Sequence, residues 1–407
     1  MVGRRVVMAQ LFHIQTVTVP FQPYGADIWD ISLSVNGGAM TLSVFAGDNA
    51  SARLVNFDVS GTLNYTDQNF LGATTDGFIS ADYGSITLNL SAMRLGAVLD
   101  VLPGEMRDAT TLTSLNSGAV NDMVSLLATS IGGNSFVISS RPDAPGIALF
   151  QQMTDGTLNA ITPTPDTSVG KISDLATFNA YGSVWIVAAS SDQDNVQSFS
   201  QDASGSLSAA ASFGAVDGLG INTPTALSPV YLNGQPYVVL ASADTGSLSV
   251  LRLEADGSFS VADHVLDDLN TRFDDTSVVQ TVTVGDAVFV LAAGSDDGFT
   301  LFRLRPDGKL FQLESYADTA ATTLNNVSAA ALEVDGSTLR IFLSSATETG
   351  ISHFSYGLSA LGTTFIGARG GVSLTGTALD DMILGGAGDD SLAGGAGPDI
   401  IIDGAGS

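Results

Sequence analysis

Short runs of apolar residues alternate with turns rich in glycine and aspartate along most of this chain. The clearest units span 235–259 and 287–310, where an apolar strand, a polar loop, a second apolar strand and an Asp-Gly turn follow one another. Segments 134–158 and 183–207 repeat this order. Runs of Val, Ile and Leu of this length, bounded by turn residues, predict β-strands joined by tight turns.

The turn glycine near the end of each unit measures the period of the repeat. It recurs at spacings of 43 to 52 residues, at Gly61, Gly104, Gly156, Gly205, Gly257 and Gly308, and a degenerate seventh unit follows at 337–358. Four short strands at this period are typical of a β-propeller blade. We therefore predict an all-β fold with a seven-bladed β-propeller over residues 1–365. A β-sandwich or a β-helix is the alternative, but neither explains seven near-equal units.

The two ends of the predicted propeller complement each other. The seventh unit has no clear outer strand, whereas residues 11–20 alternate apolar and polar side chains without belonging to a unit. A propeller ring needs a contact that joins its first and last parts. We therefore predict that residues 11–20 close the last blade, antiparallel to its third strand.

The arrangement of apolar and turn residues in these units resembles the seven-bladed lactonase-type propellers, which include relatives of 6-phosphogluconolactonase. The residues that carry the resemblance build the blade: Val239, Leu240, Ala241, Leu251, Leu253, Asp256, Gly257 and their equivalents. The resemblance implies an architecture, and function does not follow from a fold. A lactonase-like hydrolase at the channel mouth is therefore kept as an alternative.

Beyond Gly376 the composition changes to Gly, Ala, Asp and aliphatic residues in a nine-residue period. The register reads GTALDDMIL, GGAGDDSLA and GGAGPDIII over 376–402, followed by DGAGS. This is the G-G-x-G-x-D-x-U-x pattern of the RTX (hemolysin-type) repeat. We predict a short parallel β-roll over 366–407, apparently cut short at its C-terminus. A flexible glycine-rich linker is the alternative, although a linker has no reason to keep this register.

The repeat carries the atoms that Ca²⁺ prefers. Calcium takes six to eight oxygen ligands, and glycines allow a short loop to aim its carbonyl oxygens inward. The predicted ligands are the position-six carboxylates of Asp381, Asp390 and Asp399 and the backbone carbonyls of Gly376, Ala378, Gly386, Gly388, Gly395 and Gly397. The RTX resemblance implies that an ion lies between alternate turns, shared by Asp381 and Asp399. It also implies folding on calcium and export by type I secretion.

Charge and composition narrow the partners. The chain has 42 acidic and 14 basic residues and no cysteine, for a formal charge of −28. Such a chain disfavours nucleic acid and anionic lipid, and no apolar stretch is long enough for a membrane span. Acidic residues recur in the loops between second and third strands, at Asp48, Asp143, Asp192, Asp194, Asp244, Asp296, Asp297 and Glu348. These could present a protein- or glycan-binding rim, or they could serve turn capping.

These observations favour a secreted or cell-surface calcium-binding protein whose propeller is a binding, display or structural module. A structural part of a surface layer, filament or phage-like appendage is a further alternative. Arg303 lies on a predicted third strand, where we expect its side chain to extend to the blade edge.

Overall fold

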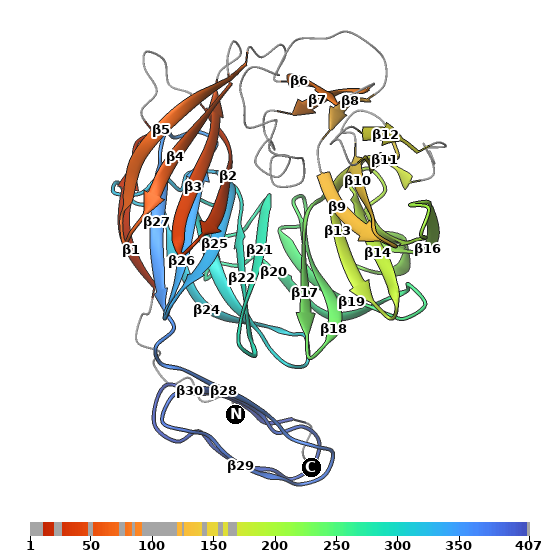
Figure 1. Ribbon diagram of the computed structural model, residues 1–407. Coiled ribbons are helices and arrows are strands. Elements are labelled where there is room, and N and C mark those ends of the chain that lie inside the picture. Colours follow the sequence, from red (N-terminus) through yellow and green to blue (C-terminus); the bar gives the residue numbers. More distant parts are fainter. Residues whose placement is uncertain are drawn as a thin grey trace.

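The computed structural model describes residues 11–19, 27–47, 52–72, 78–83, 86–91, 120–123, 126–140, 145–153, 158–161 and 169–404. In these residues, six four-stranded antiparallel sheets follow one another around a ring, which is a β-propeller (Figure 1). The strands of the first three are β2 (Asp27–Asn36), β3 (Ala39–Gly47), β4 (Ala52–Val59) and β5 (Leu63–Gly72); β9 (Leu126–Ile131), β10 (Asn134–Ser140), β11 (Ile147–Gln152) and β12 (Leu158–Ala160); and β13 (Ile172–Ala180), β14 (Ser183–Ser190), β15 (Asn195–Gln201) and β16 (Leu207–Gly214).

The other three blades complete the ring. Their strands are β17 (Pro224–Leu232), β18 (Gln235–Ser242), β19 (Ser247–Leu253) and β20 (Phe259–Leu266); β21 (Val278–Val284), β22 (Ala287–Ala293), β23 (Gly298–Leu304) and β24 (Leu310–Ala317); and β25 (Val327–Asp335), β26 (Thr338–Ser345), β27 (Ile351–Gly357) and β1 (Leu11–Val17). Within the described ranges the one complete helical element is the short 3-10 turn η4 (Ala215–Asp217), and no helix there is long and apolar enough to cross a membrane.

The prediction of a seven-bladed propeller is wrong, because the described residues form six four-stranded blades. The region of the second predicted unit contains β6 (Phe78–Tyr83), β7 (Ile86–Ser91) and β8 (Val120–Met123), which form a three-stranded sheet between the β2–β5 and β9–β12 blades (Figure 1). Its β7–β8 pair is parallel, so no hairpin can join these strands as in the other blades. The spacing to Gly104 was also the shortest of the series, and Gly104 lies outside the described residues.

The hydrophobic core lies between neighbouring blades. Each cluster of buried side chains combines residues of two adjacent sheets, as in the cluster that holds Val238 and Leu240 of β18 together with Trp185 and Val187 of β14. Middle strands are covered on both faces, so β22 is buried along its whole length and reads as an uninterrupted apolar run. The outer strands are half-exposed, and there polar and apolar residues alternate.

The turn glycines make these inter-blade contacts possible. Gly205, Gly257 and Gly308 have φ of 89°, 86° and 80°, as the Asp-Gly and Ser-Gly turns predict. Each also lies against an aromatic ring of the preceding blade, where a Cβ on Gly257 would come within 2.6 Å of Trp185. Phe136 and Tyr237 occupy the corresponding places for Gly205 and Gly308. The repeat therefore sets both the turn and the packing of one blade on the next.

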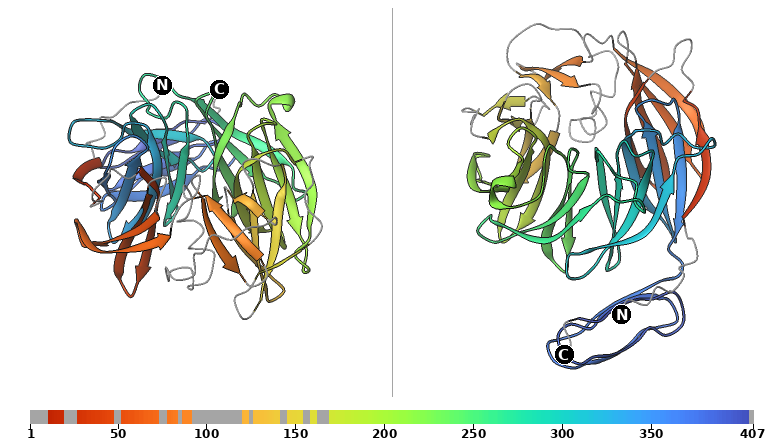
Figure 2. Two further views of the ribbon diagram at one scale, coloured as in Figure 1. Left: turned by 90° about the horizontal axis from the view of Figure 1, so that it is seen from above. Right: turned by 180° about the vertical axis from the view of Figure 1, so that it is seen from behind.

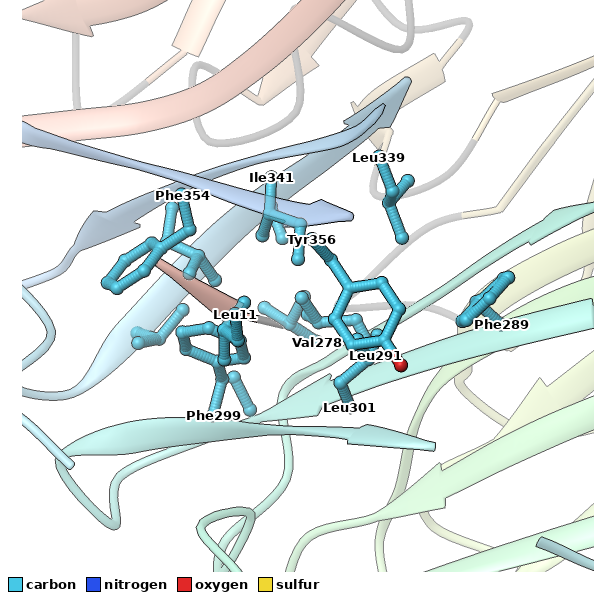
Figure 3. Packing of buried hydrophobic residues seen from close by; sticks show 14 of the residues in the cluster. Leu11, Val278, Phe289, Leu291, Phe299, Leu301, Leu339, Ile341, Phe354 and Tyr356 are labelled. Atoms are coloured by element: carbon cyan, nitrogen blue, oxygen red, sulfur yellow. The ribbon is translucent and has the colours of Figure 1, made fainter. Parts of the chain in front are cut away.

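The N-terminal strand closes the ring as the sequence predicts. β1 pairs antiparallel with β27 and is the outer strand of the last blade. Its Leu11 joins the cluster formed with the β21–β24 blade (Figure 3), and Val19 joins the cluster formed with the β2–β5 blade. The Leu11 backbone N–H also donates to Glu314 Oε1 on β24 at 3.2 Å.

A flat coil of short parallel strands follows the propeller and lies outside the ring (Figures 1 and 2). β28 (Leu361–Ile366), β30 (Asp380–Leu384) and β32 (Ile400–Ile402) form one side, and β29 (Ser373–Thr375) and β31 (Ser391–Ala393) form the other. Each strand pairs in parallel with the strand two repeats later, for example Met382 with Ile400. The sequence places the start of the coil at residue 366, which is the last residue of β28. In the structure β28 already belongs to the coil, so the coil begins at Leu361.

Candidate metal centre

The coil places an aspartate of each repeat above the first glycine of the same repeat. A Cβ on Gly376 would come within 2.6 Å of Asp381 Oδ2, and one on Gly385 within 2.5 Å of Asp390 Oδ2. Gly394 and Asp399 have the same relation. The carboxylate therefore folds back over the loop, and this is a physical reason for glycine five residues before each aspartate.

The same aspartates connect successive layers of the coil. Asp381 Oδ1 accepts the Thr363 backbone N–H at 2.7 Å, and Asp390 Oδ1 accepts that of Val372 at 2.9 Å. Asp399 Oδ1 accepts the N–H of Asp381 at 3.0 Å. In each case donor and acceptor are 18 residues apart, or two repeats. The structure thus brings Asp381 and Asp399 together in one stack, through the backbone of Asp381.

The second carboxylate oxygens of Asp381 and Asp390 differ. Asp381 is fully buried, and its Oδ2 accepts the Thr377 hydroxyl at 2.9 Å as well as the Thr377 backbone N–H. Asp390 Oδ2 is also buried, but it has no hydrogen-bond donor within the described part of the chain. A buried carboxylate oxygen without a donor or cation is unfavourable. Asp390 is therefore the aspartate most in need of a positive partner.

The loops around these aspartates have two forms. Gly386 and Gly388 have φ of 94° and 120°, and Gly395 and Gly397 have φ of 97° and 106°. In the loop 376–381 the corresponding positions hold Thr377 and Leu379, and neither has a positive φ. The predicted carbonyl ligands Gly376 and Ala378 therefore belong to a loop with a different backbone path from the two glycine loops.

The structure also shows two turns of the coil that sequence reasoning missed. Phe365 and Leu374 lie where the repeat places its aliphatic residue, and pair in parallel with Ile383 and Leu392. These turns have Thr363 and Val372 in place of the aspartate, so the pattern was not recognised. The available signal was Gly370, whose φ of 100° is positive like that of the glycine at the fourth position of the later loops.

The oxygen donors of the coil fit a hard cation. Carboxylate and carbonyl oxygens are the ligands that Ca²⁺ takes, and the loops contain no histidine or cysteine. Within the described ranges, no three His, Asp or Glu side chains come together in a group that could hold a metal. An ion here would therefore depend on backbone carbonyls together with one or two aspartates.

The acidic loops of the propeller have structural contacts. Asp194 Oδ1 accepts the Thr223 N–H at 2.8 Å, and Asp297 Oδ1 accepts the Asn326 N–H at 3.3 Å; each bond joins one blade to the next. Asp192 Oδ1 accepts the N–H of Lys171 at 2.7 Å. These bonds favour the turn-capping interpretation for the described loops. Asp48 and Asp143 lie outside the described residues.

The inner strands of the ring carry hydroxyl and carboxylate side chains, among them Asp30, Asp174 and Glu333. The first strands of neighbouring blades pack side by side, for example β13 with β17 and β17 with β21. The six inner strands that the structure describes carry no histidine or arginine, and between blades they use hydroxyls such as the Ser228–Thr281 pair at 2.8 Å. Asp174 accepts two backbone N–H groups, from Leu175 and Leu227.

The sequence predicts that the Arg303 side chain extends to the blade edge, but the structure shows it buried. Its residue is 3% exposed, and Nη2 donates to Thr364 Oγ1 on β28 at 3.0 Å. The Thr364 N–H in turn donates to Asp286 Oδ2 at 2.9 Å. Strand β28 of the coil covers this part of the propeller. Arg303 therefore lies at the junction between the propeller and the coil, and not at an exposed blade edge.

Fold and site together define an all-β protein in which a β-propeller is extended by a coil of parallel, aspartate-bearing turns. No model of a protein family matches the chain, and no curated protein resembles it in sequence.

Several solved structures are distantly similar to this chain. A Bacteroides uniformis protein proposed to be a 6-phosphogluconolactonase is 13% identical, with a TM-score of 0.48, covering 71% of this chain and 84% of that one. A fungal lectin of Aleuria aurantia, described as a six-bladed β-propeller, is 9% identical, with a TM-score of 0.44, covering 82% and 92%. The Pseudomonas aeruginosa periplasmic gluconolactonase is 14% identical, with a TM-score of 0.41, covering 81% and 85%. Likenesses this distant concern the fold alone.

Proposed function

We propose that this is a calcium-binding protein whose coil is of the RTX kind and orders on Ca²⁺, while the propeller serves as a binding or display platform outside the cell. The observation that carries the proposal is Asp390 Oδ2, a buried carboxylate oxygen with no donor among the described residues, in a glycine loop of the nine-residue repeat. A bound cation would remove the cost of burying that oxygen.

The ligands would come from the glycine loops. On one side of the coil, Asp390 would supply the carboxylate and the loop at Gly386 and Gly388, which lies against residues 367–371, would supply backbone carbonyl oxygens. On the other side, Asp399 would supply the carboxylate and the loop at Gly395 and Gly397, which lies against residues 376–380, would supply the carbonyl oxygens. Calcium would contribute a double positive charge that offsets repulsion among the acidic turns. Since ligand binding and ordering of such loops are coupled, the free energy of binding would stabilise the coil.

The proposed location follows from the strength of such a site. One carboxylate per turn on flexible glycine loops gives fewer charges and less rigidity than a cytosolic calcium sensor has. Sites of that kind belong to the weak class of extracellular modules, with dissociation constants on the order of 10⁻⁴–10⁻³ M. Millimolar calcium outside the cell would fill them.

A calcium titration of the full chain tests the proposal. We expect Asp390→Asn to weaken calcium binding, measured by calorimetry, by about tenfold or more, because an anionic ligand is lost. Asp389→Asn is the matched control, since it makes the same charge change at the neighbouring position and should have a smaller effect. Wild-type protein that binds no calcium at millimolar concentrations, or equal losses in the two variants, would contradict the proposal.

A further inference from the structure

The first aspartate turn of the coil already has its hydrogen-bond donors. Asp381 is fully buried, with Oδ1 accepting from the Thr363 N–H and Oδ2 accepting from the Thr377 hydroxyl. The buried apolar residues Met382 and Ile383 follow it directly. In the next loop Gly386 replaces threonine, and Asp390 Oδ2 lacks any donor among the described residues. The two loops therefore differ in their need for a cation.

The propeller supplies a positive charge at this first turn. Arg303 is buried beneath β28 and donates to Thr364, whose backbone pairs with Met382. Burial lowers the pKa of Arg303, while the carboxylates of Asp286, Asp381 and Asp380 oppose this shift. A buried guanidinium needs nearby negative charge, and the coil and the β21–β22 turn provide it together.

Apolar packing strengthens the same junction. Leu358 is buried in the cluster of the last two blades, and Leu361 at the start of β28 packs against that cluster. Thr364 is held from two sides, by Arg303 at its hydroxyl and by Asp286 at its backbone N–H. The first strand of the coil is thus fixed to the propeller by groups that contain no metal.

We propose that the propeller holds the first turn of the coil, β28 and β30, in place without calcium, with Arg303 as a fixed cation, and that calcium is required only from the Asp390 loop onward. The second part rests on the proposed function, whereas the first part does not. In coils whose turns contact only their neighbours, a preformed end removes the cost of starting the structure. Calcium would then extend the coil from the propeller outward.

Hydrogen exchange of the full chain in EGTA and in millimolar calcium tests this order. Amides of 361–366 and 380–384 should be protected in both conditions, and amides of 391–402 only with calcium. Equal, fast exchange of both groups in EGTA would overturn the inference. If 391–402 ignores calcium while 361–384 stays protected, the calcium proposal fails and the anchored turn stands.

Variants at the junction distinguish an effect of the Arg303–Thr364 contact on the coil from an effect on the stability of the whole protein. Arg303→Met should speed exchange of 361–384 in EGTA by about tenfold or more, the ratio expected for losing a hydrogen bond to a charged group. Arg252→Met is the matched control, because Arg252 occupies the same position on the neighbouring third strand and pairs with Glu254 instead. It should leave 361–384 unchanged.

Two further variants keep the test decisive if Arg303→Met destabilises the propeller. Thr364→Val removes the acceptor of Arg303 but leaves the arginine, and should also speed exchange of 361–384. Thr377→Gly removes the hydroxyl that donates to Asp381 Oδ2 and leaves the backbone N–H, and it should make protection of 380–384 depend on calcium. Unchanged protection of 361–384 in EGTA in both variants would overturn the inference.

Discussion

The propeller and the coil are both made of short β-strands, but different forces hold them. In the propeller, antiparallel strands of neighbouring blades bury an apolar cluster at each inter-blade contact, with β22 covered along its whole length. In the coil, the fully buried apolar side chains of 361–404 are Met382 and Ile383, while Ile366 and Ile401 are 52% and 37% exposed. Apolar burial stabilises roughly in proportion to area. The propeller's stability therefore comes from packing, and the coil's depends on its polar loops.

The largest expected effect breaks the packing of the propeller. Phe354 is fully buried on β27, near Phe299 (Figure 3). The centroid of its ring lies 5.0 Å from that of Phe299 and 4.7 Å from that of Tyr316. Phe354→Ala should lower the free energy of unfolding by about 3–5 kcal/mol, through lost contacts and a cavity. Urea unfolding followed by tryptophan fluorescence measures it.

A matched change in the coil tests whether the two regions are independent. Ile383→Ala also removes a fully buried side chain. We expect it to reduce protection of the coil amides and to leave the urea midpoint of the propeller unchanged. A comparable drop in that midpoint would show that the regions unfold as one unit, contrary to the comparison.

Acid should weaken the propeller at its closing blade. His353 is fully buried on β27, and burial, followed by the Arg340 cation and His13, lowers its pKa from 6.5 to about 4. Its Nε2 lies 3.5 Å from Arg340 Nη1; arginine can only donate, so the ring accepts and is neutral. The neutral, buried His353 ring therefore contributes its full stabilisation of the folded protein above pH 6.5, and this contribution is lost as the pH falls toward 4.

The loss should reach about 3 kcal/mol between pH 7 and pH 3, since the unfolded chain binds the proton more readily. Urea unfolding across this range measures it. His353→Phe keeps the ring stacked on Phe342, at a centroid distance of 4.5 Å in the wild type, and should flatten the pH dependence by this amount. An identical pH profile in the variant would assign the loss to other groups.

Glycine-to-alanine substitutions should have different effects in the hairpin turns of the propeller and in the loops of the coil. Gly182, in the β13–β14 turn, has φ of 79° and open space around its Cβ position, so Gly182→Ala should cost about 1–2 kcal/mol of propeller stability by backbone strain. Gly385→Ala instead places a methyl group within 2.5 Å of Asp390 Oδ2. We expect it to abolish calcium-dependent protection of 391–402 without moving the urea midpoint. Retained protection would mean that the aspartate can move aside.

The smallest effect concerns a surface ion pair of the propeller. Arg252 Nη2 lies 2.6 Å from Glu254 Oε1, and the two side chains are 40% and 31% exposed. A double-mutant cycle with Arg252→Met and Glu254→Gln should give a coupling of about 0–1 kcal/mol, because solvent screens the pair. A larger coupling would show that charge contributes to blade stability as well as packing.

Sequence reasoning predicted the structure correctly at positions where only one type of residue is compatible with the backbone and its surroundings. Gly205, Gly257 and Gly308 identified the turns because only glycine combines their positive φ with the close approach of a neighbouring ring. Residues 11–20 alternate apolar and polar side chains without belonging to a repeat unit, and this pattern likewise located β1. The second unit misled because β7 and β8 pair in parallel across a long segment, and a turn glycine carries no information about strand direction.

The candidate site was predicted in part, for a similar reason. The nine-residue register located the aspartates, but Thr363 and Val372 hid the earlier turns. Thr377 decides which aspartate already has donors, and its hydroxyl is placed only by the folded loop. The place predicted for Arg303 was wrong because a sequence does not show which part of the propeller the coil covers.

The pairing of β1 with β27 has a consequence for how the protein is made. Strand β1 leaves the ribosome before the other described strands of the propeller, yet its partner is completed only when residue 357 has been synthesised. Until then the last blade is missing, and the apolar residues of β1 have no partner strand. Ring closure therefore waits for nearly the whole propeller, and a contact so distant in sequence is slow to form. During synthesis the early blades depend on nearest-neighbour packing alone, so the growing chain is most prone to aggregation just before its final blade appears.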